Sequence, residues 1–211
     1  MSKKINKGLA LDIDETLSFT VGHLVKELQE KFGNPEKLSA EKITSKYRYT
    51  YNVPYWKNKK VEDFVKKRIH SNSLQKKLPI IKESDKYVKK INRIIPITAY
   101  ITVRPKSVIK GTKYWLDKCG FPKAKIICRP KKVSQKDGNK WKAKTLEKSH
   151  PNIIGIIDDN AGLLNYLSKD YKGTIFLYGH KKIKENKNNI SVIPCKDWKT
   201  VYKEIKKAYA K

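Results

Sequence analysis

The stretch GLALDIDETL, residues 8 to 17, decides how the chain folds. It begins with a short apolar run and ends in carboxylates, which predicts a strand over residues 8–14 that carries Asp12 and Asp14 at its end. Residues two positions apart in a strand point to the same face, so both carboxylates are directed into one space. A buried strand that ends in two charged groups indicates a polar site at its carboxyl end.

After residue 94 the sequence alternates between strand and helix patterns. The predicted strands cover residues 97–102, 125–128, 153–157, 174–178 and 191–193. The predicted helices cover residues 106–119, 141–148 and 163–167, and a last helix begins at residue 197. Parallel strands need a crossover connection, which is usually a helix, so this alternation indicates a parallel sheet. We therefore predict an α/β fold with a Rossmann-like parallel sheet flanked by helices.

Residues 20–93 have a different character, because their apolar positions follow helical spacing and no segment alternates like a strand. Predicted helices cover residues 21–32, 40–43, 61–69 and 84–95. The stretch 47–56 between them is rich in tyrosine and ends at Trp56. Three interpretations of this stretch stay open: it stacks on a base or sugar, it packs the core of the helical block, or it forms a hairpin.

Polar side chains gather at the carboxyl ends of three predicted strands. They are Asp12 and Asp14, Thr102 and Arg104, and Asp158 and Asp159. Ligands of open α/β sheets bind beyond these strand ends, so the side chains are expected to meet in one crevice. Carboxylates that converge repel one another unless a cation lies between them, and hard oxygen ligands suit Mg²⁺. The sequence thus predicts a Mg²⁺ site that bridges to a phosphorylated substrate.

Four stretches, taken in order, resemble the motifs of the haloacid dehalogenase superfamily of phosphohydrolases. DIDETL at residues 12–17 is similar to its DxDxT opening, and Thr102 after an apolar strand is similar to its second motif. A lysine in WKAK at residues 141–144 resembles the third motif, and IIDDN at residues 156–160 resembles the acidic fourth. The resemblance covers residues 1–18 and the chain from residue 94 onward.

The resemblance implies catalytic roles for the first two motifs. Asp12 would be the nucleophile that forms an aspartyl-phosphate intermediate. Asp14 would protonate the leaving oxygen and later activate water, and we expect a neighbouring carboxylate to raise the pKa of Asp14 enough for this. Thr102 would donate its hydroxyl to a phosphate oxygen. Arg104 either binds substrate phosphate or points outward.

The resemblance also implies a lysine that neutralises the charge developing on the phosphoryl group. Lys142 is preferred for this catalytic role, because Leu146 lies four residues later on the same side of the helix and would anchor it. Lys144, half a turn further on, is the alternative, and as the second lysine it would contact substrate.

The metal ligands are implied in the same way. Mg²⁺ would be held by the carboxylates of Asp12 and Asp158 and by the backbone carbonyl of Asp14. Asp159 would be a second metal ligand or an outer-shell group, and the order of Asp158 and Asp159 stays open.

The domains follow from the position of the motifs. A catalytic core of residues 1–19 and 94–211 would carry a helical cap, residues 20–93, inserted directly after the first motif. The implied activity is that of a Mg²⁺-dependent phosphomonoester hydrolase. Its expected substrate is a small phosphorylated molecule, with a nucleotide as the leading class because of the aromatic residues and the positive charge.

The charge of the chain has two interpretations. The formal net charge is +29 over 211 residues, and 44 of the 49 basic residues are lysines spread along the sequence. Lysines that meet phosphates release counterions, which favours nucleic acid or another polyanion as a partner. The alternative is an AT-rich genome that favours Lys, Ile and Asn codons. The rival functions are therefore a phosphatase acting on nucleic-acid ends and a non-catalytic protein that binds polyanions.

The remaining composition bears on location. No run approaches the roughly 18 to 20 apolar residues of a membrane span, and carboxylates interrupt the first apolar run, so we expect neither a membrane protein nor a signal peptide. Cys119, Cys128 and Cys195 are widely spaced and read as free thiols of a reducing compartment, which indicates a cytoplasmic protein. The sequence leaves the oligomeric state open.

Overall fold

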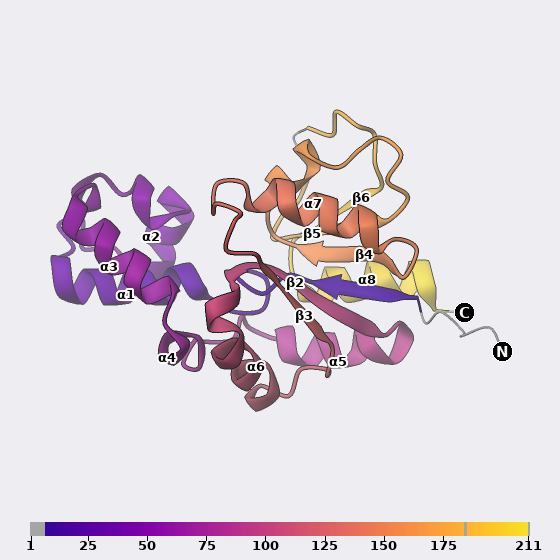
Figure 1. The fold of residues 1–211 in the computed structure, drawn as a ribbon, viewed down its shortest axis with the longest axis horizontal. Helices are drawn as coiled ribbons and strands as arrows, with labels where there is room; N and C mark the ends of the chain where they lie inside the picture. Colours follow the sequence, from indigo (N-terminus) through magenta and orange to yellow (C-terminus); the bar gives the residue numbers. More distant parts are fainter. Residues whose placement is uncertain (1–6, 184, 211) are drawn as a thin grey trace.

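The computed structural model describes residues 7–183 and 185–210. Its centre is a six-stranded sheet in the order β3-β2-β1-β4-β5-β6, in which every neighbouring pair runs parallel (Figure 1). The strands are β1 (Gly8–Leu11), β2 (Ile97–Pro105), β3 (Lys125–Arg129), β4 (Ile153–Asp158), β5 (Thr174–Tyr178) and β6 (Val192–Cys195). The predicted parallel α/β sheet is confirmed.

Strand β1 lies in the middle of the sheet because its residues suit burial on both faces. It pairs with β2 on one side and with β4 on the other, and Leu9, Ala10 and Leu11 are fully buried. The strand order reverses between β1 and β4, which makes a topological switch point. A crevice opens at the carboxyl ends of strands at such a point, so the fold directs Asp12 and Asp158 toward a ligand site.

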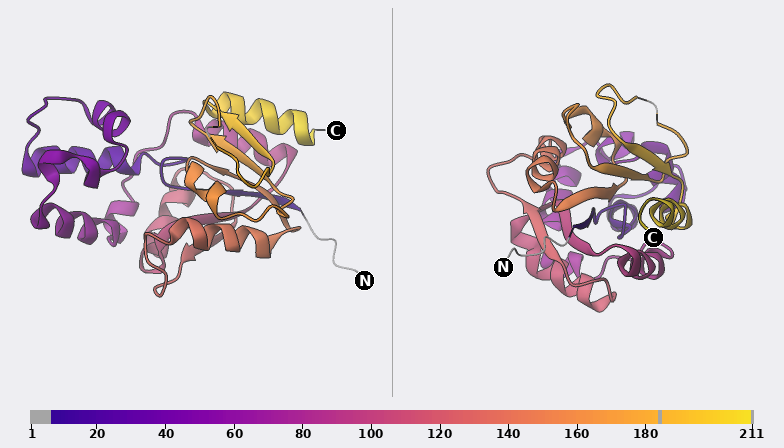
Figure 2. Two further views of the ribbon diagram at one scale, coloured as in Figure 1. Left: turned by 90° about the horizontal axis from the view of Figure 1, so that it is seen from above. Right: turned by 90° about the vertical axis from the view of Figure 1, so that its right-hand side faces the viewer.

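Helices cover both faces of the sheet. Helices α5 (Ser84–Ile94), α6 (Ile109–Lys118) and α8 (Trp198–Tyr209) pack on one face, where Leu9, Leu11 and Phe176 belong to the same buried cluster as Trp115 and Trp198. Helix α7 (Gly138–Ser149) packs on the other face (Figure 2). The core therefore has the three layers that a parallel sheet needs for the burial of its two apolar faces.

Three further helices form a separate lobe. These are α1 (Thr20–Phe32), α2 (Ala40–Tyr47) and α3 (Lys59–Ile69), and they lie together beyond the end of the sheet toward which β1 points (Figure 1). They bury a cluster of their own that includes Leu28, Ile43 and Trp56. We call residues 20–69 the helical lobe. Short helix α4 (Asn72–Gln75) then leads back to the core and packs against α6.

Helix α5 lies within the segment predicted as the cap, but its apolar side belongs to the core. Val88 and Ile91 share a buried cluster with Val201 and Ile205 of α8. Most buried apolar residues of the helical lobe thus belong to a different cluster from those of α5, whereas Leu24 of α1 is buried in the cluster of the core. Among the described residues, no helix combines the length and the apolar character that crossing a membrane requires.

Three local predictions differ from the structure. The strand predicted over residues 8–14 ends at Leu11, because the chain turns at Glu15, whose φ is 60°. The hairpin interpretation of residues 47–56 is wrong, since this stretch forms two 3₁₀ turns, η1 (Thr50–Asn52) and η2 (Pro54–Trp56). Proline has no N–H for a ladder hydrogen bond, which disfavours a hairpin here. The helix predicted over residues 163–167 is a 3₁₀ helix, η4 (Ala161–Asn165).

Candidate active site

A buried lysine joins the first and fourth motifs. Lys142 Nζ lies 2.9 Å from Asp12 Oδ1 and 2.7 Å from Asp158 Oδ2. Asp12 follows β1 directly, and Asp158 is the last residue of β4. Asp12, Lys142 and Asp158 are 5%, 2% and 0% exposed, so all three charges are nearly removed from bulk water. Burial opposes the charged form of the lysine, but the two carboxylates outweigh it and raise the pKa of Lys142.

The position of Lys142 follows from the packing of α7. Gly138, Lys142 and Leu146 repeat every four residues and are all buried, so they lie on the side of the helix that faces the sheet. A Cβ atom on Gly138 would lie 2.5 Å from a methyl group of Val103, which shows how closely the start of α7 approaches β2. Lys144 lies on another side of the helix and is exposed. The structure therefore brings Lys142 to the carboxylates and leaves Lys144 in solvent.

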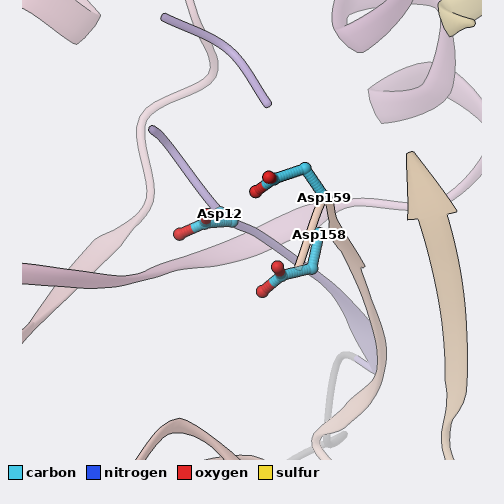
Figure 3. Close-up of side chains that lie close together, drawn as sticks. All are labelled: Asp12, Asp158 and Asp159. Atoms are coloured by element: carbon cyan, nitrogen blue, oxygen red, sulfur yellow. The ribbon is translucent and has the colours of Figure 1, made fainter. Parts of the chain in front are cut away.

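Three carboxylates converge beside this lysine. One oxygen each of Asp12, Asp158 and Asp159 lie within 4.8 Å of one another (Figure 3). Burial raises the pKa of Asp12 well above its ordinary range, although Lys142 lowers it in part and the neighbouring aspartates raise it further. Burial and the charge of Asp158 raise the pKa of Asp159 to about 7. Such a set of hard oxygen donors, only partly neutralised by Lys142, fits a divalent cation such as Mg²⁺.

Asp14 is held by Arg104. The guanidinium donates from Nε to both carboxylate oxygens, at 3.1 and 3.0 Å, and from a terminal nitrogen to Oδ1 at 2.8 Å. The same group donates to Thr112 and Ser18, and the side chain of Arg104 is only 3% exposed. Thr102 Oγ1 lies 3.5 Å from Asp14 Oδ2 and accepts a hydrogen bond from the backbone N–H of Arg104.

This contact corrects an expectation about Asp14. Burial alone would raise the pKa of Asp14, but the charge and hydrogen bonds of Arg104 outweigh burial and lower the pKa below its ordinary value. The expectation that a neighbouring carboxylate raises this pKa is therefore wrong. The charge that lowers the pKa of Asp14 belongs to Arg104, which is distant from it in the sequence.

The loop after β1 is fixed from several sides. Trp198 Nε1 donates to the carbonyl oxygen of Thr16 at 3.1 Å, and Ser84 Oγ donates to that of Leu17. Glu15 Oε1 accepts the backbone N–H of Val21 at 2.7 Å, in the first turn of α1. Thr20, the first residue of α1, donates its hydroxyl to Asp14 Oδ1. The site loop and the helical lobe are thus joined through side chains as well as through the backbone.

Comparisons with known proteins find similar folds among solved structures only. No protein-family model matches the sequence, and no curated protein matches it significantly. Among solved structures, a dehalogenase is similar over 100% of both chains, with a TM-score of 0.57 and 13% identity. A dehalogenase with an intermediate complex is similar over 97% of both chains, with a TM-score of 0.54 and 14% identity. A HAD family hydrolase from Deinococcus radiodurans R1, with bound phosphate and sodium, has a TM-score of 0.44 and 12% identity over 97% of this chain and 96% of that one.

The chain has a haloacid dehalogenase-like fold. At this level of identity the likeness concerns the fold, so the chemistry of the site has to be argued from its own residues.

The haloacid dehalogenase-like core brings most of the predicted site residues together. Those at the carboxyl ends of β1, β2 and β4, with the lysine from α7, are Asp12, Asp14, Thr102, Arg104, Lys142, Asp158 and Asp159. Lys144 is separate from them. Arg104 neither points outward nor has an accessible guanidinium, because Asp14, Thr112 and Ser18 occupy its nitrogen atoms.

Two residues beside the core site were not predicted. Arg48, from the end of α2, has a terminal nitrogen 3.8 Å from Asp159 Oδ2. His180 is half-buried, and its Nε2 donates to the carbonyl oxygen of Asp159 at 2.9 Å. His180 follows β5, so its place after a strand end was a usable signal. The sequence contains no such signal for Arg48, because its contact with Asp159 depends on how the helical lobe meets the core.

Proposed function

We propose that the protein is a Mg²⁺-dependent phosphomonoester hydrolase in which Asp12 is the nucleophile. The observation that carries the proposal is the contact of Lys142 with Asp12 and Asp158, beside the carboxylate of Asp159. Lys142 opposes the effect of burial and favours the ionised form of the nucleophile, and the neighbouring carboxylates can hold a cation that offsets the charge of an anionic substrate.

The reaction begins with attack by an oxygen of Asp12 on the phosphorus atom. The bond to the leaving alcohol breaks, that alcohol takes up a proton, and an acyl phosphate forms on Asp12. Lys142 offsets the negative charge on the phosphoryl oxygens, and Thr102 donates its hydroxyl to one of them. Water then hydrolyses the acyl phosphate and restores the carboxylate. Mg²⁺ held by Asp12, Asp158, Asp159 and the carbonyl of Asp14 would supply further electrostatic stabilisation of the phosphoryl group.

Asp14 handles the proton in this scheme. Its contact with Arg104 lowers its pKa, so Asp14 is present as a carboxylate, which is the form that accepts a proton from the attacking water in the second step. For the first step, the contact with Arg104 has to lengthen so that Asp14 takes up a proton from water, and Asp14 then gives this proton to the leaving oxygen. We therefore propose Arg104 as a positioning residue of Asp14.

The helical lobe acts as the cap in this proposal. It lies beyond the carboxyl ends of the strands (Figure 1), and Arg48 reaches from it to Asp159. A domain in this position excludes water and contacts the part of the substrate that leaves. A nucleotide is the leading substrate class, and its support is given in the next subsection.

The test is hydrolysis of p-nitrophenyl phosphate, ribose 5-phosphate and nucleoside monophosphates in Mg²⁺ buffer. We expect turnover that stops with EDTA and in Asp12→Asn, whereas the exposed Asp170→Asn behaves as wild type. Halide release from a haloacid, measured in parallel, tests whether the protein acts as a dehalogenase instead. Halide release without metal and no phosphate release would contradict the proposal.

A second candidate function is favoured by a basic groove between α5 and α8. It is lined by Tyr87, Lys90, Lys199, Tyr202, Lys203, Lys206, Lys207 and Ala210, without a carboxylate. Lysines with tyrosines in a groove suit a nucleic-acid strand, which would make the protein a nucleic-acid end phosphatase or a non-catalytic binder. Reversing two charges, Lys203→Glu with Lys206→Glu, should then weaken oligonucleotide binding and reduce its salt dependence. Equal binding by wild type and variant would exclude this function for the groove.

A further inference from the structure

The aromatic stretch between α2 and α3 divides into two groups. Trp56 is 1% exposed, and Tyr47 and Tyr55 pack with it in the cluster of the helical lobe. Tyr49 and Tyr51 are absent from that cluster, and Tyr51 is 66% exposed. One part of the stretch therefore builds the lobe, whereas the other part leaves the ring of Tyr51 open to solvent and that of Tyr49 half-buried.

Tyr49 and Tyr51 are held in a defined geometry relative to each other. The rings of Tyr49 and Tyr51 are stacked, with centroids 5.2 Å apart and planes inclined by 13°. Thr50 between them is buried and begins the 3₁₀ turn η1. Arg48 before them, which caps the end of α2, has a φ of 63°, a backbone conformation that is uncommon for non-glycine residues.

A chain of contacts leads from this pair to the active site. Arg48 lies 3.8 Å from the carboxylate of Asp159, and its Nε donates to the hydroxyl of Tyr49 at 3.1 Å. Tyr49 in turn stacks on Tyr51. Arg48 thus stands between the carboxylate cluster and the aromatic pair, and 48% of its side chain is exposed to solvent.

We infer that Arg48, Tyr49 and Tyr51 bind a nucleoside monophosphate whose phosphate is at Asp12. This inference rests on the proposed function and names its substrate class. A flat base stacks on tyrosine, and a guanidinium pairs with phosphate. In this binding mode the ribose spans the part of the site beside Arg48, and the base meets the tyrosines.

The experiment compares adenosine 5′-monophosphate with ribose 5-phosphate, which carries the same phosphate and sugar without the base. For wild type we expect kcat/KM to be about tenfold or more higher for the nucleotide, the size of one stacking contact. Tyr51→Ala should remove this ratio, whereas Tyr51→Phe should keep the ratio. Tyr114→Ala, at another exposed tyrosine on α6, is the matched control.

Binding to the Asp12→Asn variant separates this inference from the proposed function. Calorimetric titration of that variant measures the preference for the base without turnover, and Tyr51→Ala in the same background should abolish the preference. Equal affinity for nucleotide and ribose 5-phosphate overturns the inference, even if wild type hydrolyses both. If no phosphate is hydrolysed but the base still strengthens binding through Tyr51, the proposed function fails and the binding site stands.

Discussion

Arg104 binds both carboxylate oxygens of Asp14, although 90 positions separate the two residues in the sequence. The pair joins the first motif to β2 and is enclosed by hydroxyl groups of Ser18 and Thr112. It therefore contributes both to the stability of the site and to the ionised state of Asp14.

Replacing Arg104 should destabilise the protein. In Arg104→Met, Asp14 loses its cation, and removal of one partner from a fully buried pair costs roughly 3 to 5 kcal/mol. Because 31% of the Asp14 side chain is exposed, we expect a smaller loss. It should be about 2 kcal/mol in the free energy of unfolding, as measured with urea in metal-free buffer. Arg104→Lys, which keeps the charge, should lose less.

The same variant should show a defined pH dependence. The folded state lowers the pKa of Asp14, so the pair stabilises the protein above about pH 4, the ordinary aspartate value, and this stability is lost as the pH falls through the lowered pKa. The difference between wild type and Arg104→Met should therefore shrink below about pH 4. A difference that grows on acidification would contradict this assignment.

Two lysines half a turn apart on α7 should behave differently. Lys142→Met leaves Asp12 and Asp158 buried without their cation, so we expect a loss of about 3 kcal/mol in metal-free buffer together with loss of hydrolysis. Lys144→Met removes an exposed charge and should change stability by less than about 0.5 kcal/mol. Similar effects of the two substitutions, in unfolding and in activity, would count against Lys142 as the catalytic lysine.

Mg²⁺ should stabilise the folded protein. A ligand that binds only the native state, present at about 100 times its Kd, adds about 2.7 kcal/mol. We expect thermal unfolding to shift upward with Mg²⁺ and to return with EDTA. Asp158→Asn should weaken this shift, whereas Asp170→Asn should keep it. The site is assigned wrongly if the shift is equally large in both variants.

The thiols should differ in reactivity. Cys195 is fully buried, and burial raises the pKa of its thiol to about 12, whereas Cys119 and Cys128 are half-buried. Ellman's reagent should therefore leave Cys195 unmodified in the native protein and react with it on unfolding in urea. Cys195→Ser should have an unchanged native reaction. A rapid native reaction that disappears in this variant would show that β6 opens readily.

Much of the fold could be predicted because its signals are local. The apolar runs that end in Asp12 and Asp158 are short enough for strands, and parallel strands place their carboxyl ends at one edge of a sheet. The preference for Lys142 over Lys144 needed only the four-residue spacing to Leu146, and the structure places the two lysines in that way. The catalytic roles of these residues remain predictions.

The contacts that sequence reasoning missed are those between distant segments. Nothing near Arg104 in the sequence indicates that its partner is Asp14, and nothing near Arg48 indicates Asp159. The sequence leaves three interpretations of the aromatic stretch open, because the burial of Trp56 and the exposure of Tyr51 depend on how the helical lobe packs. Local composition does not contain that information.

The hydrogen bond from Trp198 to the carbonyl oxygen of Thr16 has a consequence for the order in which the protein is made. The ribosome produces the loop with Asp12 and Asp14 well before the indole that donates to it, because this indole belongs to α8, which follows every other element that the structure describes. A growing polypeptide that has not reached residue 198 lacks this support for the loop that carries Asp12. We therefore expect a nascent chain to stay without hydrolytic activity until α8 has emerged and docked.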